Sequence, residues 1–98
     1  MNVVRHVVVH GRVQGVGYRA FVEQEALMHG LQGWVRNRRD GTVEVLFEGD
    51  AAVVDVVIEC CRRGPFAARV ETIDQRPGGP ADIKLRRPGD LFSVLPTV

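Results

Sequence analysis

With 98 residues, of which 45% are hydrophobic and 26% charged, the chain is long enough for one folded domain and too short for two domains that each bury a core. Thirteen basic and twelve acidic residues leave a formal net charge of +1, so the charge balance requires neither a polyanionic partner nor a membrane surface. No apolar run approaches the length of about 20 residues that crosses a bilayer, and the start of the chain lacks the pattern of a signal peptide. The two cysteines, Cys60 and Cys61, are adjacent and cannot join distant parts of the chain. We therefore expect a single cytoplasmic domain over residues 1–98.

The first third of the chain predicts a strand, a glycine-rich loop and a helix. Residues 3–10 are mostly valine, which is typical of a largely buried strand. Three glycines within residues 11–17 indicate a loop. Apolar residues then recur with the spacing of one helical face, at Tyr18, Phe21, Val22 and Ala26. Gly30 is suited to end this helix.

The remainder predicts a hairpin, a second helix and further strands. Strands over 34–38 and 43–48 are separated by an Asp-Gly turn signal, and a helix capped by Asp50 ends at residues 62–65. A fourth strand is predicted over 69–74 and a last one over 92–95. Residues 75–90 are rich in proline and glycine and predict a long connection with a short edge strand at 82–86. This order predicts a ferredoxin-like α+β sandwich made of split βαβ units, with two helices on one face of an antiparallel or mixed sheet of four or five strands.

The glycine-rich loop and the residue that follows it suggest an anion site. A loop between a buried strand and a helix presents free N–H groups next to the positive end of the helix dipole. Arg19 comes one turn into the helix, where its guanidinium can form two parallel bonds to a phosphate. Spacing alone is equally compatible with a simple turn followed by a solvent-exposed arginine. A dinucleotide-binding loop is rejected, because Asn37 stands near the position where that motif needs an acidic residue.

Two segments resemble the acylphosphatase family: GRVQGVGYR over residues 11–19 and GLQGWVRNRRDGTVEVLFEG over residues 30–49. The resemblance implies an enzyme that hydrolyses the carboxyl–phosphate bond of acyl phosphates, with Arg19 binding the phosphate and Asn37 orienting the attacking water. It also implies a phosphate cradle made of backbone N–H groups, those of Gln14, Gly15, Val16, Gly17 and Tyr18. We further expect Thr42 to brace Asn37 through a hydrogen bond. A small acyl phosphate is then the expected partner of a monomeric enzyme that uses no cofactor, nucleic acid or membrane.

Two alternatives remain open at this level. One is a non-catalytic module that binds phosphate or RNA, since RNA-recognition domains share this architecture. RNA binding needs exposed aromatic residues on the central strands, whereas Trp34 and Phe47 are predicted to lie in the core. The other is that the same module forms part of a larger maturation enzyme. The length of the chain favours a stand-alone enzyme over this alternative. A metal site is not expected, because His6 and His10 lie about 13 Å apart along one strand.

Overall fold

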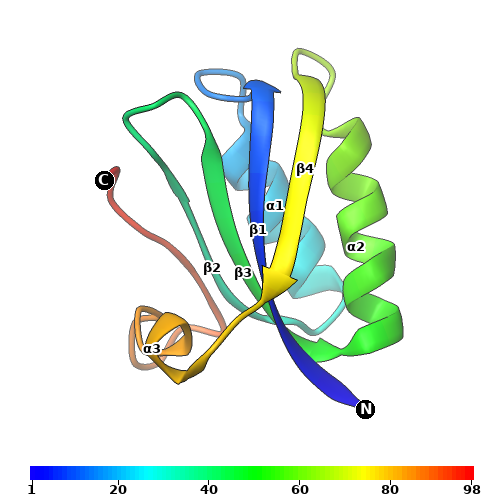
Figure 1. Cartoon of the computed structure of the whole chain (residues 1–98), viewed down its shortest axis with the longest axis vertical. Helices are drawn as coiled ribbons and strands as arrows, with labels where there is room; N and C mark the ends of the chain where they lie inside the picture. The colour runs from blue at the N-terminus through cyan, green and yellow to red at the C-terminus, as the bar shows by residue number, and fades with distance from the viewer.

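The computed structural model describes all 98 residues and contains five strands and three helices. They follow one another as β1 (Asn2–Arg12), α1 (Tyr18–Met28), β2 (Gln32–Asn37), β3 (Val43–Asp50), α2 (Ala51–Arg63), β4 (Arg69–Pro77), α3 (Pro80–Ile83) and β5 (Phe92–Val94). The strands form one sheet in the order β4-β1-β3-β2-β5, in which only β5 runs parallel to its neighbour (Figure 1). Helices α1 and α2 lie on the same face of the sheet. The predicted ferredoxin-like fold is thus confirmed.

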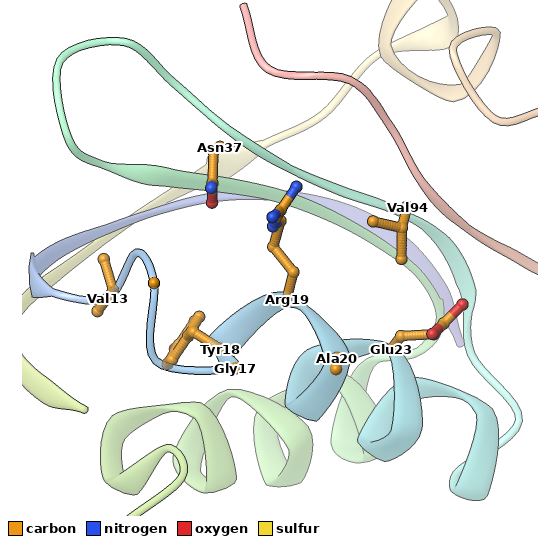
Figure 2. Close-up of a pocket in the computed structure, with 9 residues that line it drawn as sticks. Val13, Gly17, Tyr18, Arg19, Ala20, Glu23, Asn37 and Val94 are labelled. Atoms are coloured by element: carbon orange, nitrogen blue, oxygen red, sulfur yellow. The ribbon is translucent and has the colours of Figure 1, made fainter. Parts of the chain in front are cut away.

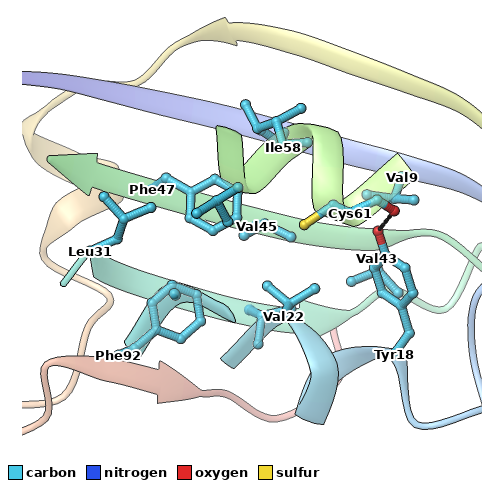
Figure 3. Close-up of a cluster of buried hydrophobic side chains, with 14 of the residues drawn as sticks. Val9, Tyr18, Val22, Leu31, Val43, Val45, Phe47, Ile58, Cys61 and Phe92 are labelled. Atoms are coloured by element: carbon cyan, nitrogen blue, oxygen red, sulfur yellow. Dashed lines mark hydrogen bonds between the residues drawn. The ribbon is translucent and has the colours of Figure 1, made fainter. Parts of the chain in front are cut away.

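The main core lies between this face and the two helices (Figure 3). Because side chains alternate along a strand, every second residue of β1 and β3 points toward the helices, and those of β3, Val43, Val45 and Phe47, are completely buried. Both helices contribute an apolar stripe to the same cluster. The Tyr18 hydroxyl at the start of α1 donates to the carbonyl of Cys61 in α2 at 2.8 Å, which links the two helices across the core.

The opposite face of the sheet carries a smaller core of Trp34, Leu46 and Leu95, with Ile83 of α3 packed against it. The Trp34 side chain is completely buried, and its indole N–H is satisfied by donating to the carbonyl of Asp82 in α3 at 2.7 Å. The prediction of an edge strand at 82–86 is wrong. Pro80 occupies the first turn of a short helix there, where its missing N–H costs nothing. The Asp82 carboxylate accepts the N–H of Gly79 at 2.9 Å and stabilises that helix start.

The remaining boundaries differ by a few residues from the prediction. β4 continues to Pro77, three residues beyond its predicted end, because it stays paired with β1 as far as Arg5. After β5 the chain runs alongside β2, where the N–H of Leu95 donates to Val35 and that of Val98 to Asn37 (Figure 1). None of the three helices has the length and apolar character needed to traverse a bilayer.

Candidate functional site

A pocket of about 390 Å³ opens between the glycine-rich loop, α1, the end of β2 and β5. Its walls are formed by Val13, Gly15, Gly17, Tyr18, Arg19, Ala20, Glu23, Asn37 and Val94. Figure 2 shows Arg19 rising from α1 toward the sheet and the amide of Asn37 directed toward the loop. The structure therefore brings Arg19 and Asn37, which are 18 positions apart in the sequence, into one cavity.

The backbone N–H groups of the glycine-rich loop between β1 and α1 have no hydrogen-bond acceptor within the protein. Gly15 and Gly17 have φ angles of 73° and 79°, in the left-handed region that glycine enters without strain. These angles turn the chain sharply between the end of β1 and the first residue of α1. No hydrogen bond is donated by the backbone N–H groups of residues 14 to 17, and that of Tyr18 belongs to the first helical turn, which has no intrahelical acceptor. Such a run of unpaired N–H groups at a helix start is an anion-binding arrangement.

Arg19 adds a full positive charge beside these donors. It lies in the first turn of α1, where its side chain is half-buried and lines the pocket. Ion pairs to carboxylates are made by Arg5, Arg36, Arg38, Arg62 and Arg76. Arg19 makes none, so its five N–H donors remain available to a ligand. A guanidinium with unpaired donors next to free N–H groups suits a bidentate anion such as phosphate.

Asn37 is the last residue of β2 and points to the helix side of the sheet, since it pairs with Val43, which is buried in the core. Only 8% of the residue is exposed. Its Oδ1 atom is buried and accepts no hydrogen bond from the protein. A buried amide oxygen without a donor is costly, so its presence at the wall of a pocket points to a ligand or water as its partner.

The Gln14 side chain connects the loop to the β2–β3 turn. Its Nε2 atom donates to the carbonyl oxygens of Arg38 and Thr42 at 2.7 and 2.8 Å. These two hydrogen bonds set the spacing between the loop N–H groups and the end of β2 that carries Asn37. The predicted bond from Thr42 to Asn37 is absent, because the Thr42 hydroxyl donates to Asp40 Oδ1 at 2.7 Å within the turn. The Thr42 hydroxyl therefore stabilises the turn through Asp40, and the Thr42 carbonyl accepts the hydrogen bond from Gln14.

On the face of the sheet opposite to Asn37, the carboxylate of Glu44 binds Arg36 and Arg38, the two residues that flank Asn37 in the sequence. Glu44 accepts hydrogen bonds from Arg36 at 2.6 Å, from Arg38 at 2.8 Å and from His6 at 2.6 Å. Burial by itself would raise the pKa of Glu44, but the hydrogen bonds from Arg38, His6 and Arg36 outweigh it and lower the pKa to about 2. Glu44 is thus a buried, ionised acceptor that holds residues 36 and 38 on the side of the sheet facing away from the pocket.

Four pocket residues were not predicted from the sequence: Val13, Ala20, Glu23 and Val94. Glu23 lies four residues after Arg19, a spacing that places both on one side of α1, so helical periodicity was the available signal. Val94 had no such signal, because only the parallel pairing of β5 with β2 brings it to the pocket. Of the residues of the predicted phosphate cradle, Tyr18 is 1% exposed and Val16 packs partly buried against the core.

Fold and site together define a small α+β protein whose loop before the first helix presents unpaired N–H donors beside an arginine. Comparisons with known proteins show which family this protein belongs to. The acylphosphatase family model matches residues 5–84. An acylphosphatase of Rhodopseudomonas palustris (strain BisB18) is 59% identical over 97 residues, which cover 99% of this chain and 98% of that one. The chain belongs to the acylphosphatase family.

Solved structures agree with this assignment. The crystal structure of acylphosphatase from Bacillus subtilis has a TM-score of 0.82 at 35% identity, and the match covers 97% of this chain and 99% of that one. The fold also occurs inside a larger protein: the crystal structure of T. kodakarensis HypF matches with a TM-score of 0.75 at 33% identity, over 96% of this chain but only 12% of that one.

Proposed function

We propose that this protein hydrolyses acyl phosphates to a carboxylate and inorganic phosphate. The observation that carries the proposal is the convergence, in one pocket, of unpaired loop N–H groups, an arginine without an ion pair and a buried amide oxygen without a donor. Family membership supports the same reaction. The site residues follow the family resemblance: Arg19 and the N–H groups of residues 14–18 bind the phosphate, and Asn37 orients the attacking water.

The chemistry explains why so few functional groups suffice. The leaving group is a carboxylate, whose conjugate acid has a pKa of about 4, so its departure needs no proton from the enzyme. Phosphoryl transfer passes through a loose transition state with negative charge on the equatorial oxygens. The guanidinium of Arg19 and the loop N–H groups are placed to stabilise this charge by fixed donors.

Asn37 is suited to position water rather than to deprotonate it. Its Oδ1 atom accepts a hydrogen bond from the water and its Nδ2 atom can donate to a substrate oxygen, which fixes the direction of attack. A strong base is not required, because bond breaking to the carboxylate leads in a loose transition state.

Two substitutions test the assignment. Arg19→Ala is expected to lower kcat/KM for acetyl phosphate about 10³-fold and to abolish most inhibition by inorganic phosphate. Asn37→Ala is expected to lower kcat about 10²-fold with a smaller change in the phosphate inhibition constant. Phosphate release is measured with a chelator present, and the exposed residues Arg63 and Asn2 provide matched controls as Arg63→Ala and Asn2→Ala. Equal losses of phosphate affinity in both site variants would contradict the division of roles.

We further propose that residues 1–98 act as one cytoplasmic, monomeric unit on a small-molecule substrate, without cofactor or nucleic acid. Both cysteines are free thiols, as expected in a reducing compartment. Sedimentation at micromolar concentration tests the monomer, and a mass near twice 10.8 kDa would refute it.

A further inference from the structure

The pocket carries a second charged side chain that the proposed reaction does not use. Glu23 follows Arg19 by one helical turn and lines the same cavity. Its side chain is half-buried, and it is absent from the carboxylates that form ion pairs, which are Asp50, Asp55, Glu44, Asp74, Glu25, Glu59 and Asp82. Glu23 therefore forms no ion pair within the protein, and its carboxylate is available to act on a ligand in the pocket.

The two ends of the pocket differ in electrostatic character. Figure 2 shows Gly17 and Val13 on one side of Arg19, and Glu23 and Val94 on the other. The side with the loop offers N–H donors and attracts the phosphate. The side with Glu23 offers one carboxylate, flanked by the apolar side chains of Ala20 and Val94, and repels a phosphate. A substrate with an anion at one end only is thus oriented with its phosphate at the loop.

We propose that Glu23 selects the acyl group: this enzyme prefers acyl phosphates whose acyl group is uncharged or cationic over those whose acyl group carries a carboxylate. The inference rests on the proposed acyl phosphate hydrolysis and extends it to a substrate class. A carboxylate at the far end of the acyl group meets the unpaired carboxylate of Glu23, whereas an aliphatic chain meets Ala20 and Val94.

The size of the pocket keeps this repulsion effective. A volume of about 390 Å³ has linear dimensions of about 7–9 Å, comparable with the Debye length of about 8 Å at physiological ionic strength. Two like charges at that separation, in a cavity partly open to water, disfavour binding about three- to tenfold. The effect is expected to shrink as salt is added.

The test uses three substrates that differ only at the far end of the acyl chain. They are butyryl phosphate, succinyl phosphate and 4-(trimethylammonio)butyryl phosphate, which end in a methyl, a carboxylate and a quaternary ammonium group. Phosphate release is measured with the spontaneous rate subtracted. We expect kcat/KM to be about three- to tenfold lower for succinyl than for butyryl phosphate, and at least as high for the cationic substrate as for butyryl phosphate.

Glu23→Gln is expected to raise the succinyl-to-butyryl ratio of kcat/KM by the same factor of about three to ten. Since both substrates carry the same phosphate, this ratio cancels any general effect of the substitution on phosphate binding. Glu25→Gln is the matched control: it removes a carboxylate from the same helix, but one that pairs with His29 outside the pocket, so the ratio stays that of the parent.

Three results would overturn the inference. One is a succinyl-to-butyryl ratio unaffected by Glu23→Gln, and another is an equal change in both variants. The third needs no variant: a ratio in the parent protein that does not move toward 1 between about 20 mM and 300 mM salt. Folded protein that hydrolyses none of the three substrates would instead refute the proposed function itself.

Discussion

Replacing Glu44 with Gln removes the buried carboxylate behind Asn37 and keeps its size. In the parent protein, three donors hold this carboxylate ionised, and its pKa is lowered from 4.5 to about 2. Because the folded pKa lies below the unfolded one, the stabilisation is fully present above pH 4.5 and is lost as the pH falls toward 2.

The magnitude follows from this difference in pKa. A lowering of the pKa by about 2.5 corresponds to about 3 kcal/mol of folding free energy at pH 7 and about 1 kcal/mol at pH 3. Glu44 is 5% exposed, so solvent screening reduces these values little. The Glu44→Gln variant lacks this titration, so its difference in stability from the parent is expected to narrow by about 2 kcal/mol between pH 7 and pH 3.

Urea unfolding at several pH values between 3 and 7 measures this difference. Glu48→Gln is the matched control, because Glu48 lies on the same face of β3 without an ion pair and is half-buried. We expect the control to stay within about 0.5 kcal/mol of the parent at every pH. A Glu44→Gln difference that is independent of pH would refute the argument, since the lost stability would then not come from an ionised carboxylate.

Three further predictions concern residues around the pocket and core. Gln14→Leu removes two hydrogen bonds between the loop and the β2–β3 turn, so we expect a loss of about 1–2 kcal/mol and weaker phosphate inhibition; an unchanged inhibition constant would show that the bonds serve stability alone. Burial raises the pKa of the Cys61 thiol to about 12, whereas Cys60 is half-buried, so a thiol reagent at pH 8 is expected to label one cysteine in the folded protein and two in urea. Rapid labelling of both in the folded state would contradict the packing of α2. Tyr18→Phe leaves the buried Cys61 carbonyl without its donor and is expected to cost about 1–2 kcal/mol in urea unfolding, and an unchanged midpoint would argue against that bond.

Local patterns predicted most of the fold because their causes are local. A run of valines places β1, alternating residues place β3, and the helical spacing that includes Val22 and Ala26 places α1, since these patterns follow directly from backbone geometry. The edge strand at 82–86 was wrong because Pro80 and Asp82 start a short helix there, and this helix is held against the sheet by the hydrogen bond from Trp34, which local patterns do not reveal. Thr42 was assigned to Asn37 because both lie in the second family segment, but the Thr42 hydroxyl donates to the nearer carboxylate of Asp40.

The sequence by itself determined the order of the five strands and the two long helices, the glycine-rich loop and, through the family motif, the pairing of Arg19 with Asn37. Only the tertiary structure decided what surrounds that pair: Val94 across the pocket, Gln14 reaching residues 24 and 28 positions away, and Glu44 meeting His6 across 38 positions. The reason is physical. Helix and strand periodicity is imposed by the backbone of neighbouring residues, whereas hydrogen bonds and charges in a pocket depend on which distant segments the packed sheet brings together.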